Sequence, residues 1–114
     1  MKTFKISKND VQSVEVEQKY IIDNYLSDGT DLGFSVVVSH LDGSHPLMKN
    51  TLSNRLYYFL KGKGKFFVED KTFEVEAGDM LVVPKNTFYK FEGKFDAVLI
   101  SCPAFDPKTD VIIK

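Results

Sequence analysis

The chain has 114 residues, with 43% hydrophobic and 27% charged side chains and a formal net charge of −1. This length supports one domain with a single core, and the charge gives no basic surface for nucleic acid or an anionic membrane. The sequence contains no run of about 18 apolar residues, so it predicts no membrane span. The start MKTFKISKNDVQS is polar and does not resemble a secretory signal. Cys102 is the only cysteine, which excludes an internal disulfide. We therefore expect a cytoplasmic, single-domain protein without nucleic-acid or membrane partners.

The predicted elements are almost all short β-strands. Ten Phe, five Tyr and many Val and Ile favour strands over helices. Turn residues separate the strands. Ser27-Asp28-Gly29 is a turn signal before one strand, Lys61-Gly62-Lys63-Gly64 ends another, and Pro84 ends a third. Glu69-Asp70-Lys71 predicts a hairpin, and Glu92-Gly93-Lys94 predicts the turn between the last two strands. Segment 18–26 fits either an irregular strand or a helical turn. In chain order, the expected strands are 13–17, 33–39, 55–60, 65–68, 72–76, 80–83, 88–91 and 95–101.

Eight short strands in about 110 residues, with no capped helix, predict an all-β antiparallel barrel or double sheet, a jelly roll among them. Closing the sheet also removes edges that such apolar strands would otherwise expose.

Glycine and proline spacing makes the prediction more specific. Gly43 and Gly62 fit the frame G-x5-H-x-H-x3-E-x6-G, and Gly78 and Pro84 fit G-x5-P-x-G-x2-H-x3-N, with Asn86 at its second glycine. These are the two motifs of the cupin family, which the chain therefore resembles. The resemblance implies a single-domain cupin-like jelly-roll barrel (double-stranded β-helix) over residues 1–114, with its motif core at 43–93.

The metal-ligand positions of these motifs hold other residues. The two His positions of the first motif fall on Lys49 and Thr51, its Glu position on Arg55, and the His of the second motif on Tyr89. Protonated Lys and Arg have no lone pair to give a metal. We therefore expect a barrel that keeps the family's frame without its metal, and without any other cofactor.

The resemblance implies that the ligand-bearing face looks into the barrel. By strand alternation this predicts a pocket with a cationic head and aromatic walls. A buried guanidinium needs a protein carboxylate or a bound anion, and most acidic residues of the central strands fall in turns, so we favour an anion at Arg55. The candidate ligand-binding residues are Arg55, Tyr57, Phe59, Tyr89, Phe91 and Lys49.

Proton transfer has weaker candidates. Tyr89 and His40 are the candidate catalytic residues, with His40 at a pocket rim, although a hydrogen-bonded histidine at a strand end is the plainer interpretation. His45 lies in a loop before Pro46, and a slip in register would bring it toward the pocket. Asp79 is interpreted as a turn-capping carboxylate, and Cys102 as an unreactive structural thiol.

Four functions remain open. The first is a small-molecule-binding protein for an anionic or sugar-like metabolite, and the second is a metal-independent sugar isomerase or epimerase. A metal-dependent cupin enzyme and a filled, purely structural barrel are the others. We also expect a homodimer, because cupins often pair through their terminal strands and the apolar stretches 11–16 and 111–113 need covering.

Overall fold

The computed structural model describes residues 3–16, 20–26 and 32–113. It confirms the all-β prediction: the two helical segments described, η1 (Lys8–Asp10) and η2 (Pro107–Thr109), are single 3-10 turns. No helix among these residues has the length and hydropathy to cross a membrane. The strands are β1 (Gln12–Val16), β2 (Tyr20–Leu26), β3 (Ser35–Asn50), β4 (Asn54–Val68), β5 (Lys71–Glu76), β6 (Met80–Val83), β7 (Tyr89–Cys102) and β8 (Asp110–Ile113).

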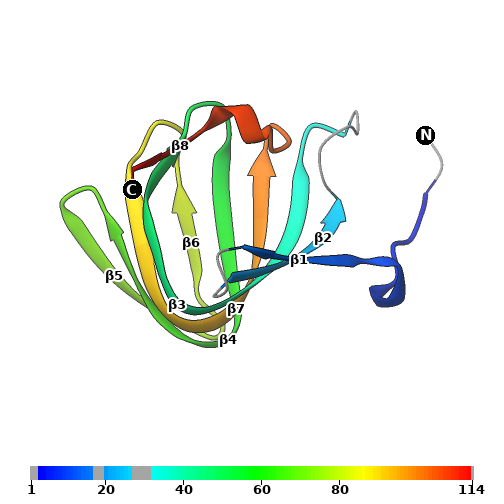
Figure 1. Ribbon diagram of the computed structural model, residues 1–114, viewed down its shortest axis with the longest axis horizontal. Helices are drawn as coiled ribbons and strands as arrows, with labels where there is room; N and C mark the ends of the chain where they lie inside the picture. The colour runs from blue at the N-terminus through cyan, green and yellow to red at the C-terminus, as the bar shows by residue number, and fades with distance from the viewer. Residues whose placement is uncertain (1–2, 17–19, 27–31, 114) are drawn as a thin grey trace.

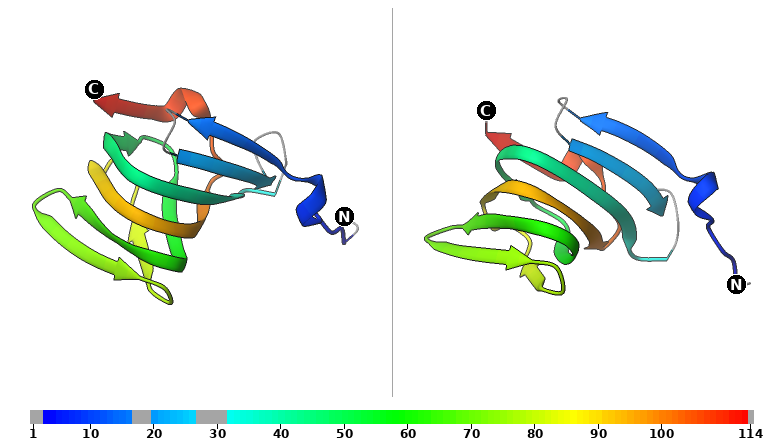
Figure 2. Two further views of the ribbon diagram at one scale, coloured as in Figure 1. Left: turned by 60° about the horizontal axis from the view of Figure 1, so that its bottom comes forward. Right: turned by 90° about the horizontal axis from the view of Figure 1, so that it is seen from below.

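All the strands pair antiparallel in the order β1-β2-β3-β7-β4-β5. β6 pairs with the first half of β4, and β8 with the end of β3. The long strands β3, β4 and β7 bend in the middle, so each contributes to both walls of the barrel (Figure 1). The sheet thus folds over itself as a jelly roll, while β1 and the N-terminal segment extend to one side (Figure 2).

Glycines mark the bend. Gly43 pairs with Gly93, and Gly93 pairs with Gly64, so three glycines stand side by side across β3, β7 and β4. Gly93 has φ +136°, and a Cβ there would lie 2.5 Å from the Lys63 carbonyl oxygen. Only glycine allows the strands to approach this closely. Gly43, the first glycine of the cupin-like frame, is therefore explained by the geometry of the bend.

Two predicted turns were wrong. Residues 61–64 do not end a strand, because β4 continues from Asn54 to Val68 with a bulge between Phe59 and Lys61. Likewise 92–94 lies inside β7. Of the predicted segment 18–26, residues 20–26 form a strand, which was one of the two alternatives, and 18–19 lie outside the described residues. The hairpin at residues 69–71 and strand 80–83 are confirmed, whereas the turn predicted at 27–29 lies outside the described residues.

The core is aromatic and fills one end of the barrel. Phe59, Phe66 and Phe95 pack with ring centroids 5.2–5.8 Å apart, next to the glycine bend. The predicted inward face is confirmed on both motif strands, because the side chains of Arg55, Tyr57, Phe59, Tyr89 and Phe91 are all 5% exposed or less. The other end of the barrel is hollow.

Candidate functional site

A cavity of about 280 Å³ occupies the hollow end of the barrel. Its walls come from β1, β2, β3, β4, β7 and the C-terminal segment. Apolar side chains line most of it, and the polar groups converge from five strands. These polar lining residues include Tyr20, His45, Arg55, Tyr57 and Asp110.

Arg55 is held inside the protein by a carboxylate. Its Nη2 donates to Asp110 Oδ1 at 2.8 Å, and its Nη1 donates to the Tyr89 hydroxyl at 3.1 Å. Asn50 Nδ2 donates to the same Asp110 oxygen at 2.9 Å. Burial alone would lower the pKa of Arg55, but Tyr89, Tyr57 and Asp110 outweigh it and raise the pKa. Of the two alternatives stated for Arg55, the favoured bound anion was therefore wrong as its partner, because Asp110 of β8 supplies the protein carboxylate.

Two tyrosines continue this chain of hydrogen bonds. The hydroxyls of Tyr57 and Tyr89 lie 2.7 Å apart, so Arg55, Tyr89 and Tyr57 are linked in series. Burial raises the pKa of Tyr57 well above 10, and raises that of Tyr20 to about 12. At neutral pH both phenols keep their protons and act as donors rather than bases.

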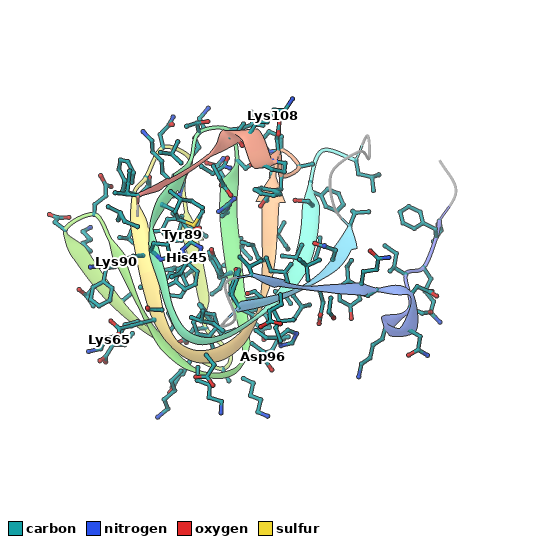
Figure 3. The ribbon with its side chains drawn as sticks, in the orientation of Figure 1. His45, Lys65, Tyr89, Lys90, Asp96 and Lys108 are labelled. Atoms are coloured by element: carbon teal, nitrogen blue, oxygen red, sulfur yellow. The ribbon has the colours of Figure 1, made fainter. Side chains whose placement is uncertain are left out.

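His45 is the imidazole of the cavity. Its ring stacks on Phe91 with centroids 4.8 Å apart and meets the edge of Tyr20 at 5.7 Å. Nδ1 donates to the Pro46 carbonyl oxygen at 2.8 Å, which leaves the lone pair of a neutral ring on Nε2. Figure 3 shows His45 and Tyr89 on the concave side of the sheet, whereas Asp96 and Lys108 lie on its outside.

A bulge in β3 explains why Lys49, contrary to the prediction from the sequence, does not face the pocket. The register of β3 against β7 shifts between His45 and Met48, so alternation restarts there and Met48 and Asn50 point inward. Lys49 instead places its Nζ 4.8 Å over the ring of Phe88, and it does not line the cavity. Pro46, which cannot donate to the ladder, was the available signal for this bulge.

Phe59 and Thr51 also lie outside the cavity. Phe59 is buried in the aromatic core at the glycine bend, and Thr51 is exposed, with its hydroxyl donating to the Thr109 carbonyl. Of the predicted ligand-binding residues, the structure brings Arg55, Tyr57 and Phe91 to the cavity wall, with Tyr89 directly behind them.

The prediction that His40 reaches a pocket rim was wrong. His40 lies on the same face of β3 as Val36 and Val38, and that face points outward. His40 is bonded on both sides, with Nε2 2.7 Å from Asp23 Oδ2 and Nδ1 2.8 Å from Asp96 Oδ1. It is the hydrogen-bonded strand histidine of the plainer interpretation, and the imidazole in the cavity is that of His45.

The His40 cluster predicts a pH dependence of stability. Burial alone would lower the pKa of His40, but Asp23 and Asp96 outweigh it and raise the pKa, whereas Ser13 and His40 lower that of Asp23. A raised histidine pKa stabilises the fold fully below the unfolded value, about 6.5, and the effect is lost as pH rises through the folded pKa. Since the His40 side chain is 36% exposed, we expect at most about 1 kcal/mol.

Urea unfolding of wild type and His40→Gln at a series of pH values checks this. The stability difference should be largest near pH 6 and should shrink toward pH 8.5. His45→Gln, which changes the only other histidine, should keep the wild-type trend. A stability difference between wild type and His40→Gln that does not change with pH would contradict the assignment.

The pattern of the family described as Cupin domain matches residues 38–102, more than half of the chain. The chain belongs to the cupin family. An uncharacterized protein of Methanocaldococcus jannaschii is 34% identical over 67 residues, which cover 57% of this cupin and 54% of that protein. This chain therefore matches about half the length of that relative.

Solved structures share the whole fold. A Streptomyces PAC13 variant with uridine superimposes with a TM-score of 0.88 at 23% identity, covering 100% of this cupin and 93% of that chain. Pac13 is described as a unique nucleoside dehydratase. KdgF from Halomonas sp. gives a TM-score of 0.79 at 14% identity, covering 90% and 97%. At these identities the likeness establishes the fold alone.

The residues of this cupin do not fit the metal that the family's motifs imply. The inward positions next to the motif hold a thioether, an amide, a guanidinium and a phenol, from Met48, Asn50, Arg55 and Tyr89. Among the described residues, no three His, Cys, Asp or Glu side chains come together as a metal site. The Arg55 guanidinium, at the Glu position of the motif, has no lone pair for a metal. We therefore assign no step of the chemistry to a metal.

Proposed function

We propose that this cupin is a metal-independent proton-transfer enzyme that binds a small hydroxylated molecule, of the sugar or nucleoside kind, in its barrel. One observation carries the proposal: the imidazole of His45 and the phenol of Tyr57 line the same cavity. Both rings pack against Phe91, at centroid distances of 4.8 and 6.1 Å. A base and an acid facing one cavity are the minimum that such chemistry needs.

The two groups have complementary roles. His45 Nε2 accepts a proton from carbon, because the Pro46 carbonyl holds the other nitrogen as N–H. Tyr57 gives a proton, and the Tyr89 hydroxyl, held in place by Arg55 Nη1, donates a hydrogen bond to the phenolate oxygen that forms. In an elimination, His45 takes the proton beside a carbonyl, the C–O bond breaks, and Tyr57 protonates the departing hydroxyl as water. Epimerisation or isomerisation uses the same pair without loss of water.

The comparison with Pac13 supports this chemistry. The related Streptomyces structures with uridine carry two Tyr-to-Phe changes and one His-to-Gln change, one in each variant. Tyrosine and histidine are also the residue types in the cavity of this cupin. The proposal therefore favours an uncharged nucleoside or sugar as the first ligand to test.

Deuterium exchange tests the function without knowledge of the product. Incubation in D₂O with a panel of sugars, uridine and their carbonyl derivatives should show, by NMR, exchange of a carbon-bound proton in at least one compound. His45→Gln and Tyr57→Phe should each lower the rate by about 100-fold or more, the usual contribution of a general acid or base. Tyr58→Phe is the matched control, because Tyr58 is the next residue of β4 and is 44% exposed on its outer face. Exchange that is equal in all four proteins would contradict the proposal.

Binding without catalysis is the second candidate. It is favoured by the Tyr57 hydroxyl, which already bonds to Tyr89 inside the protein and whose pKa is raised by burial. Saturable uridine binding with no exchange of any carbon-bound proton would select it.

We propose that the cupin is a homodimer whose interface lies on a different surface from the terminal stretches 11–16 and 111–113. β8 is already paired with β3 of the same chain. The outer face of β4 and β6 carries Tyr58, Leu60, Met80 and Val82, each 44–60% exposed. Such a patch is typical of an interface. Light scattering should give twice the 13.0 kDa of one chain, and Met80→Glu should halve that mass. A wild-type mass of one chain at micromolar concentration would refute the dimer.

A further inference from the structure

One nitrogen of Arg55, Nε, has no hydrogen-bond partner in the described part of the chain. The Arg55 side chain is 5% exposed, and Nε itself is buried. The two terminal nitrogens are both engaged, by Tyr89 and Asp110. A buried N–H without an acceptor is costly, and Arg55 forms part of the cavity wall. The unmet requirement is therefore for an acceptor oxygen at this end of the cavity, and because Nε is itself buried, that oxygen reaches it through a small shift of the Arg55 side chain.

The charge of that acceptor is constrained by Asp110. The carboxylate lies 2.8 Å from Arg55 Nη2, and the Asp110 side chain is only 18% exposed. The pair is neutral as a whole, and Asp110 also lines the cavity. An incoming anion would meet a second negative charge in a poorly hydrated space, whereas a carbonyl or hydroxyl oxygen would not.

We propose that Asp110 determines specificity: by neutralising Arg55, it makes this end of the cavity accept an uncharged carbonyl or hydroxyl oxygen on Nε and reject carboxylates and phosphates. This deepens the proposed function and rests on it for the kind of molecule bound. The charge selection itself follows from the Arg55–Asp110 pair alone. It replaces the anionic ligand that Arg55 suggested from the sequence.

Asp110→Asn tests the selection with inorganic phosphate as the anionic probe. Asparagine keeps an oxygen for Arg55 and removes the negative charge, so phosphate affinity, measured by calorimetry, should rise at least about tenfold. The double variant Arg55→Met/Asp110→Asn should not show this rise in phosphate affinity. Glu74→Gln is the charge control, because it removes an exposed carboxylate on β5 and should bind phosphate as wild type does. Equal phosphate affinity of wild type and folded Asp110→Asn would overturn the proposal.

A measurement on wild type keeps the test independent of the variant's folding. The NMR signal of the Arg55 Nε–H should shift when uridine is added and stay unchanged with phosphate. A shift with phosphate would overturn the charge selection even if uridine also binds. If uridine does not bind but Asp110→Asn gains phosphate, the choice of nucleoside fails while the selectivity role of Asp110 stands.

Discussion

Replacing Gly62 by alanine is expected to lower the free energy of unfolding by about 3–4 kcal/mol, a strained backbone and an overpacked contact together. Gly62 has φ +86°, and a Cβ there would lie 2.0 Å from the Lys94 carbonyl oxygen and 2.8 Å from Phe95 Cα. Both are backbone atoms of β7, which pairs with β4 along this whole segment. Neither can move without breaking the register of the sheet. Urea unfolding, followed by circular dichroism, measures the loss.

Gly78→Ala separates the two contributions. Gly78 also has a positive φ, +95°, but a Cβ there meets nothing within 4 Å. Only the backbone cost of about 1–2 kcal/mol should appear. If the two alanine variants lose the same stability, the close approach of β4 and β7 is not what selects glycine at position 62.

Removing the partner of Arg55 is the second large effect. Asp110→Leu should cost about 2–4 kcal/mol, since it leaves a guanidinium that is 5% exposed without its carboxylate. Arg55→Met in the same protein should recover most of that loss, because the charge that needed a partner is gone. Chemical unfolding of the two single variants and the double variant measures the coupling. A double variant whose loss equals the sum of the two single losses would show that the pair does not hold β8 onto the barrel.

The alternation of β4 and β7 was readable from the sequence. Strands bury every second residue, so Arg55, Tyr57 and Phe59 had to share one face. The resemblance to cupins indicated that this face looks into the barrel. Gly62, Gly64 and Gly93 were interpreted as turn residues, although they lie inside β4 and β7. A glycine in a long strand and a glycine in a hairpin look alike locally, and only pairing with Gly93 across the sheet distinguishes them.

The site itself depended on contacts that local patterns do not contain. Asp110 meets Arg55 across 55 residues of sequence, so the missing carboxylate could not be found near the motif. His45 enters the cavity by the same alternation that buries Ser39 and Leu41, whereas Lys49 leaves it because a single bulge after His45 shifts the alternation of β3. His40 and His45 differ in role because they lie on opposite faces of the same strand.

A uridine titration of EDTA-treated protein, followed by NMR, tests most directly the claim that this cupin binds a small uncharged molecule in its barrel without a metal. We predict saturable shifts centred on His45, Arg55, Tyr57 and Phe91, unchanged by added zinc or manganese. Binding that appears only after a metal is added, or shifts confined to the outer face around His40, would contradict the claim.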